Sequence, residues 1–206
     1  MKSSYEIIIQ RNLDQLFGAD LEERALAMGA RKDGQALALT AFGAPCRLSP
    51  SEIHLDGRVQ TGPLGVVISL YGLHAVTEAI HQEPFKAFKE LPDSAPYVGA
   101  FTSHTEQILV PKVDRIIKNR ETIMERLQGR PASPAVGGDD SMVVQPLPKI
   151  LLCYIFYAAD EDFPASATCL YSHNAHRFMP VDGLADVAEY TSRAILALLD
   201  PPHRPA

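Results

Sequence analysis

The sequence of 206 residues contains no tryptophan and has no excess of positive charge. Its 19 lysine and arginine residues stand against 25 aspartate and glutamate residues, so the formal net charge is −6. Nucleic acids and anionic membranes require a basic surface on the protein that binds them. The charge balance therefore argues against both as main partners, and the absence of tryptophan argues against a large stacking platform.

Cysteine is also scarce. The three cysteines, Cys46, Cys153 and Cys169, are widely spaced and form no C-x-x-C pair. An odd number of cysteines in apolar segments fits reduced thiols better than a disulfide framework, so we expect a cytoplasmic protein. No run approaches the roughly 18 consecutive apolar residues of a membrane span. The apolar stretch at residues 7–9 is too short for a signal peptide, and we expect no membrane partner.

The most informative stretch that is present runs from Pro146 to Tyr171. Residues 150–157 form an unbroken apolar and aromatic run, which predicts a strand buried on both faces. An acidic corner follows at residues 160–164, and residues 167–171 are expected to return beside the first strand. We expect this pair to form the centre of the sheet.

Helical patterns flank the central pair. Two capping boxes, Ser3 with Glu6 and Asp20 with Glu23, predict two N-terminal helices. Further helices are expected after Gly62-Pro63, from Pro111 to about Gln128, and from near Asp182 to the Pro201-Pro202 stop.

Between the second N-terminal helix and the helix after Gly62-Pro63, the period of the apolar residues shifts towards two. Three short antiparallel strands are predicted within residues 36–39, 46–48 and 53–55. His54 would then point away from Ile53 and Leu55, towards solvent or a cleft.

These elements predict an α+β fold with a single mixed or antiparallel sheet, packed with N-terminal, central and C-terminal helices. We expect one globular domain over residues 1–206. The composition of residues 130–141 predicts a mobile surface loop, and residues 201–206 a flexible tail.

Polar residues gather after the two central strands. Asp160, Glu161 and Asp162 could bind a hard cation or supply a general base, or they could form a solvated turn. His173 and His176 lie three residues apart, so both imidazoles could reach a metal, although a polar connector is the alternative. We expect these five residues to border a ligand site, with Asp160, Asp162, His173 and His176 as candidate metal ligands.

Other catalytic patterns are weak. Ser103 with His104, or Cys153 with any histidine, are possible nucleophile pairs, but no G-x-S-x-G elbow is present. A thiol inside an apolar strand is normally inert. No Walker loop or G-x-G-x-x-G fingerprint occurs, and the sequence indicates neither a cofactor nor an oligomeric state.

The C-terminal third contains Pro146-Leu147-Pro148, the apolar strand, Ala159 to Ala165, Leu170-Tyr171 and Met179-Pro180. In these features, with weaker agreement around Phe42-Gly43 and residues 64–71, the chain resembles a family of uncharacterised proteins, mostly from anaerobic bacteria and archaea, known only as a domain of unknown function. Some relatives carry a cysteine-rich iron–sulfur segment ahead of this domain, which implies accessory work beside redox or cofactor metabolism. That segment is not among these 206 residues, and the resemblance supplies no catalytic residues.

The leading interpretation is a cytoplasmic accessory domain that binds a small molecule or a partner protein near the acidic corner and the histidine pair. The first alternative is a metal-dependent enzyme in which Glu161 is the base. The second is a structural subunit joined through its first helices.

Overall fold

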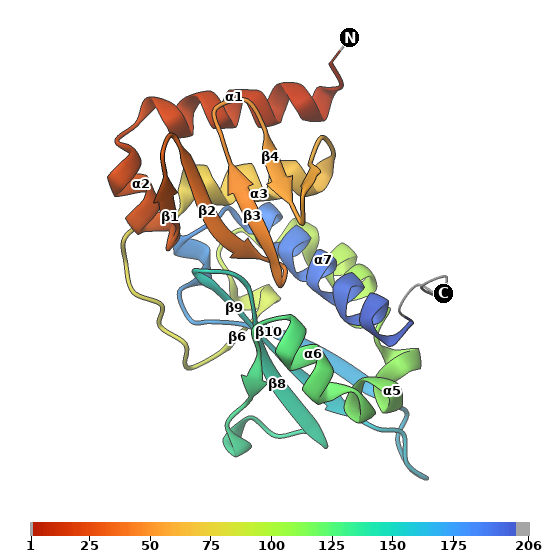
Figure 1. The fold of residues 1–206 in the computed structure, drawn as a ribbon. Helices are drawn as coiled ribbons and strands as arrows, with labels where there is room; N and C mark the ends of the chain where they lie inside the picture. The colour runs from red at the N-terminus through yellow and green to blue at the C-terminus, as the bar shows by residue number, and fades with distance from the viewer. Residues whose placement is uncertain (1, 201–206) are drawn as a thin grey trace, which may run out of the picture.

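The computed structural model describes residues 2–200 and confirms the predicted α+β fold (Figure 1). The α-helices are α1 (Ser4–Gly18), α2 (Leu21–Met28), α3 (Pro63–His74), α4 (Val98–Phe101), α5 (Val113–Lys118), α6 (Arg120–Arg126) and α7 (Val181–Leu199). The strands are β1 (Arg31–Asp33), β2 (Ala36–Ala41), β3 (Ala44–Leu48), β4 (Ile53–Leu55), β5 (Arg58–Val59), β6 (Lys86–Ala87), β7 (Arg130–Pro131), β8 (Asp140–Leu147), β9 (Ile150–Tyr157) and β10 (Ser166–Tyr171). Within residues 2–200 no helix combines the length and apolar character that a membrane crossing requires.

Of the two predicted capping boxes, Ser3 with Glu6 is present in full, whereas Asp20 with Glu23 forms only the bond to the Asp20 side chain. The Ser3 backbone amide donates to the Glu6 carboxylate at 2.7 Å, and the Glu6 amide donates to the Ser3 hydroxyl at 3.2 Å. The Asp20 carboxylate accepts from the Glu23 amide at 2.9 Å. Each cap satisfies amides that have no partner inside the helix, which explains where α1 and α2 begin.

Strands β1 to β5 form an antiparallel meander in sequence order, which we call sheet A. Its β2–β3 and β4–β5 turns use Phe42-Gly43 and Asp56-Gly57, and all four residues have positive φ. Such turns match the twist of the strands that they join. One face of sheet A is apolar and buried against α1 and α3, and the other face lies open (Figure 1).

Strands β6 to β10 form a second antiparallel sheet in the order β6-β10-β9-β8-β7, which we call sheet B. The prediction that β9 is buried on both faces is confirmed. Leu152, Tyr154 and Phe156 face the main core, whereas Leu151, Cys153 and Ile155 face a second cluster. That cluster is closed by side chains from outside regular strands, Ile80, Phe85, Ala132 and Val136.

The prediction of a single sheet is wrong, because the ten strands divide into two sheets of five. Local hairpins join the strands of sheet A, and residues 60–85 then separate sheet A along the chain from β6, the first strand of sheet B. Alternation of apolar residues predicts that a segment is a strand but does not give its partner. The sheets meet where the Phe42 amide donates to the Pro146 carbonyl at 2.7 Å.

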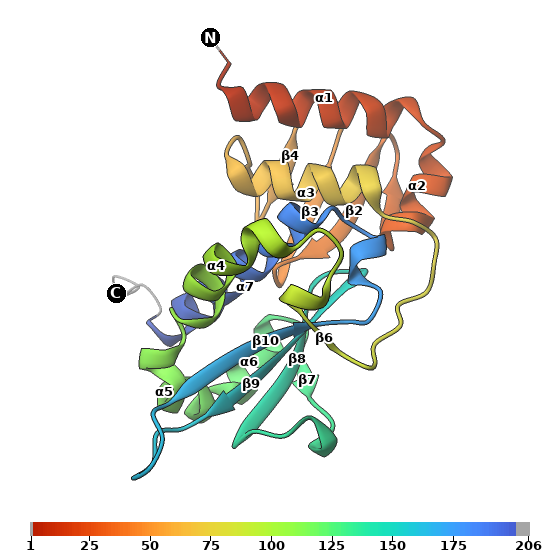
Figure 2. The same ribbon diagram turned by 180° about the vertical axis from the view of Figure 1, so that it is seen from behind.

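Helix α7 covers the inner face of sheet B and contacts α3 (Figure 2). The Tyr154 hydroxyl lies 2.9 Å from the Ser192 hydroxyl, and the Tyr171 hydroxyl donates to the Leu184 carbonyl at 2.9 Å. The two tyrosines are fully buried, so α7 is joined to β9 and β10 by polar as well as apolar contacts.

The single helix predicted from Pro111 to about Gln128 is also wrong. A 3₁₀ turn (Val110–Lys112), α5 and α6 occupy this stretch, and the break falls at Asn119. The Asn119 side-chain amide donates to the Arg115 carbonyl at 2.8 Å. The break coincides with the backbone of Asn119, which has a φ of −107° and a ψ of 12°, and asparagine is less favourable inside a helix than most residues.

Residues 130–141 contain β7, a 3₁₀ turn (Pro134–Val136) and the start of β8. Both ends of the segment therefore belong to sheet B. The mobility predicted for it stays a prediction, and the tail predicted at 201–206 lies outside the described residues.

Candidate functional site

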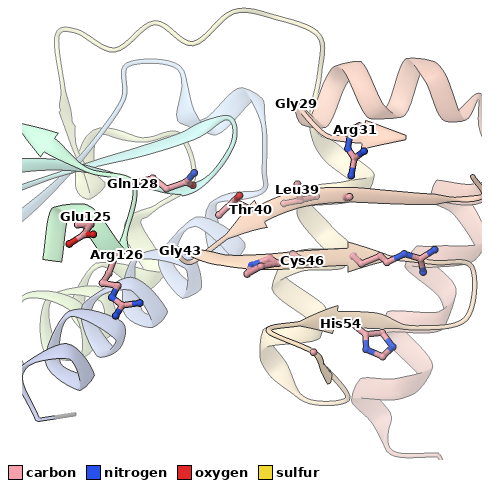
Figure 3. Close-up of a pocket in the computed structure, with 14 residues that line it drawn as sticks. Gly29, Arg31, Leu39, Thr40, Gly43, Cys46, His54, Glu125, Arg126 and Gln128 are labelled. Atoms are coloured by element: carbon pink, nitrogen blue, oxygen red, sulfur yellow. The ribbon is translucent and has the colours of Figure 1, made fainter. Parts of the chain in front are cut away.

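A cleft with a volume of about 990 Å³ lies between the open face of sheet A and the end of α6 (Figure 3). One wall of the cleft is a row of paired residues across sheet A. Arg31 pairs with Ala38, Ala38 with Arg47, and Arg47 with His54. Residues paired across strands share a face of the sheet, so these side chains form one row that faces away from the core.

The opposite wall comes from a segment far away in the sequence. Glu125 and Arg126 at the end of α6, together with Gln128, line the cleft from this side. In Figure 3 these three residues lie at one end of the cleft, whereas His54 lies on sheet A at the other.

The Phe42-Gly43 turn holds the two walls together. Gly43 has a φ of +77°, and a Cβ atom at this position would overlap the backbone carbonyl oxygen of Arg126. Glycine is required here for both reasons, since only the missing side chain lets the turn of sheet A approach α6 this closely.

The cleft is electropositive within an acidic protein. Arg31, Arg47 and Arg126 contribute three positive charges and Glu125 one negative charge, which gives 3 − 1 = +2 with His54 neutral. The whole chain carries −6. A local excess of positive charge against this background favours an anionic occupant.

Two of the side chains that line the cleft already have carboxylate partners. Arg47 lies 3.5 Å from the Asp33 carboxylate, and His54 lies 2.8 Å from the Glu52 carboxylate. Arg31 and Arg126 form no ion pair with any residue between 2 and 200. Their guanidinium groups therefore keep their hydrogen-bond donors for a ligand.

Cys46 borders the cleft on β3, but its side chain belongs to the main core, on the same face of the strand as Leu48. The residue is 3% exposed, and burial raises the pKa of its thiol to about 12. A thiol rather than a thiolate is present at neutral pH, so Cys46 is not a nucleophile for a molecule in the cleft.

The predicted acidic corner lies at the turn between β9 and β10. One Asp160 oxygen accepts from the amides of Asp162 and Phe163, at 2.9 and 2.7 Å, as in a turn stabilised by its own side chain. Glu161 and Asp162 are exposed. A cavity of about 330 Å³ beside the turn is lined by Asp139, Tyr157, Ala158, Asp160, Phe163, Pro164 and Ser166.

The predicted histidine pair follows the other end of β10. His173 and His176 are partly buried, and the Nδ1 atom of each is buried without a hydrogen-bond partner among residues 2–200. Desolvation lowers the pKa of His176, and the positive charges of Lys86 and Arg177 lower it further. The neutral imidazole is therefore favoured.

The structure does not bring the acidic corner and the histidine pair together. The six residues of β10 separate them, a span of about 20 Å at roughly 3.3 Å per residue. Figure 2 shows the β9–β10 turn at one tip of sheet B and the chain after β10 at the other end. A single metal site made of Asp160, Asp162, His173 and His176 is therefore not assembled.

No group of three or more histidine, cysteine, aspartate and glutamate side chains that could hold a metal ion occurs within residues 2–200. A ligand role for the acidic corner or for the histidine pair alone stays a prediction.

The proposed nucleophile pairs find little support. Burial raises the pKa of the Cys153 thiol to about 12. The His104 Nδ1 atom lies 3.4 Å from a carboxylate oxygen of Glu189, on a neighbouring helix.

Sequence reasoning found His54 but missed the arginines around it. The alternation of β4 placed His54 on the face away from the core, and it lines the cleft. Arg31 and Arg47 follow from the same alternation once the strand register is known. Arg126 gave no signal, because an arginine in the last turn of a helix is ordinarily a solvated residue.

Residues 20–194 match the family described as "Domain of unknown function (DUF3786)". The match covers most of the chain, including sheet A, α6 and the cleft between them. Neither a curated protein nor a solved structure matches the chain.

Proposed function

We infer the function from the site alone, because the chain belongs to the DUF3786 family, whose function is unknown. We propose that the protein is a binding domain for a small anionic molecule that carries phosphate or carboxylate groups. The ligand lies in the cleft between the open face of sheet A and the end of α6. Arg31 and Arg126 bind its charged groups from the two walls.

One observation carries the proposal. Two arginines without ion-pair partners among residues 2–200, from segments almost a hundred residues apart, line the same 990 Å³ cleft. A guanidinium donates two parallel hydrogen bonds to a carboxylate or a phosphate, and such charge-assisted bonds are the stronger kind. The volume lies near the upper end of the range for small-molecule pockets, which is roughly 300–1,000 Å³.

The remaining lining residues fit recognition rather than covalent chemistry. Thr40 and Gln128 offer a hydroxyl and an amide close to the α6 wall (Figure 3). The pKa of the Cys46 thiol is high, so the thiol stays protonated and is not a nucleophile. This combination supports the accessory binding role over the enzyme alternative.

Compartment and context complete the proposal. All three cysteines are free and buried, which supports a reducing compartment such as the cytoplasm. A link to anaerobic redox or cofactor metabolism is part of the same proposal and is supported by the family resemblance alone.

Calorimetric titration with inorganic pyrophosphate and with citrate tests the proposal. We expect saturable binding of at least one of these anions, weakened by added salt. The double variant Arg31→Ala/Arg126→Ala should bind at least about tenfold more weakly, because each charge-assisted hydrogen bond contributes roughly 1.5–3 kcal/mol.

The matched control is Arg11→Ala/Lys89→Ala, which removes two positive charges from exposed positions outside the cleft. It should bind as the unmodified protein does. Equal losses in the two double variants would mean that only the overall charge matters. That result, or no binding of either anion, would contradict the proposal.

A further inference from the structure

A second and smaller cavity, of about 180 Å³, lies where the π-helix η3 (Thr102–Glu106) meets the first turns of α7. Three carboxylates of α7 line it, those of Asp182, Asp186 and Glu189. Spacings of four and three residues place them on one face of the helix. The cavity shares no lining residue with the cleft beside sheet A.

The three carboxylates differ in whether a positively charged side chain lies beside them. Glu189 lies 2.7 Å from the Arg193 guanidinium and 3.4 Å from the His104 imidazole. Asp186 has no ion pair within residues 2–200. Desolvation raises the pKa of Asp186, and the negative charges of Glu189 and Asp182 raise it further. The cavity therefore has a carboxylate that lacks a cation.

A second feature of the cavity is independent of its charge. Thr105 lines it and is fully buried, yet its hydroxyl oxygen has no hydrogen-bond partner within residues 2–200. In an α-helix a threonine hydroxyl often bonds to the carbonyl four residues earlier. Thr105 makes no such bond. It lies in the widened turn of η3, in which the Gln107 amide donates to the Thr102 carbonyl at 2.9 Å.

Most of the remaining lining is apolar. Tyr97, Ala100, Phe101 and Ala185 contribute apolar surface, and the Phe101 ring stacks on Phe88 with centroids 4.3 Å apart. A volume of 180 Å³ equals about six water molecules at roughly 30 Å³ each. Only a molecule of a few non-hydrogen atoms fits.

We propose that this cavity binds a small aliphatic amine, whose ammonium group bonds to Asp186 and to the Thr105 hydroxyl while its methylene groups lie against Tyr97 and Phe101. A buried hydroxyl without a partner requires an explanation, and an ammonium donor supplies one. An ammonium group also supplies Asp186 with a positively charged partner, which no side chain within residues 2–200 provides. The inference goes beyond the proposed anion site and does not depend on it.

Titration of the full chain with 1,4-diaminobutane tests this inference, with 1,4-butanediol as an uncharged molecule of the same length. We expect saturable binding of the diamine and none of the diol. Asp186→Asn, which keeps the shape and removes the charge, should weaken binding by at least about tenfold. Thr105→Val, which keeps the shape and removes the hydroxyl, should weaken it by roughly three- to tenfold.

Asp114→Asn is the matched control, because it removes a carboxylate from an exposed position on α5 outside the cavity. It should leave binding unchanged, and thermal melting verifies that each variant is folded. Absence of saturable diamine binding, or unchanged binding in Asp186→Asn, overturns the inference. The Arg31→Ala/Arg126→Ala variant should bind the diamine normally, so failure of one proposal is distinguishable from failure of the other.

Discussion

Tyr71 on α3 joins two distant parts of the chain through a single hydroxyl. The residue is fully buried, and its hydroxyl donates to the Met28 carbonyl at 2.6 Å and accepts from the Lys149 amide at 3.0 Å. Met28 ends α2, whereas Lys149 lies in the turn between β8 and β9. One side chain therefore pairs a carbonyl beside sheet A with an amide of sheet B.

Replacing Tyr71 by phenylalanine should lower the free energy of unfolding by about 1–3 kcal/mol, because it leaves a carbonyl and an amide without a partner in a site closed to water. Denaturant unfolding measures the loss. Tyr5→Phe is the control, since Tyr5 is 48% exposed and should change stability by less than about 0.5 kcal/mol. Equal small effects in both variants would show that the Tyr71 hydroxyl contributes nothing.

Individual residues also show how far sequence reasoning reaches. The direction of His54 follows from strand alternation, which is a local property, and was predicted. The convergence of Arg31 and Arg126 depends on how an edge strand and a helix almost a hundred residues away pack together. No local pattern contains that information.

At the scale of elements, the β2–β3 hairpin depends on Gly43. Gly43→Ala should lower the free energy of unfolding by more than about 2 kcal/mol, because it adds steric overlap with the Arg126 carbonyl to the strain of a positive φ. It should also weaken anion binding, since α6 must move away from sheet A.

Gly34→Ala separates the two causes. Gly34 has a φ of +62°, but a Cβ atom there would meet nothing within 4 Å. Only the backbone strain of about 1 kcal/mol should appear in this variant, without loss of anion binding. Similar melting temperatures for the two variants would contradict the close packing of the turn on α6.

The elements that sequence predicted correctly are those whose cause is local. Side-chain caps start α1 and α2, and an apolar run forms β9. The break at Asn119 was missed because the apolar spacing continues across it. The division into two sheets was missed because strand partners are chosen by tertiary packing.

At the scale of the whole molecule, the two sheets share one main core. The same apolar cluster contains Leu37 and Leu48 of sheet A, Ile68 of α3, and Leu152 and Tyr154 of sheet B. The shared core and the two hydrogen bonds of the Tyr71 hydroxyl indicate that neither sheet unfolds alone. The acidic corner and the histidine pair also belong to this scale, because β10 holds them apart although only a few residues separate them in the sequence.

We therefore predict a single cooperative unfolding transition for the full chain. Scanning calorimetry should give a calorimetric enthalpy equal to the van't Hoff enthalpy, and circular dichroism of backbone and aromatic groups should change together. Two separate transitions would show that sheet A and sheet B are independent domains.

The two walls of the anion cleft, residues 29–57 and 125–128, meet at the Phe42-Gly43 turn. A molecule that bonds to both walls binds the native state and not the unfolded chain, so it stabilises the native state reversibly. At a free concentration of a hundred times its Kd it adds about 2.7 kcal/mol to the free energy of unfolding. Under the proposed function, a shortage of the ligand leaves the chain easier to unfold and to degrade, so the amount of protein in the cell follows the supply of the molecule that it binds.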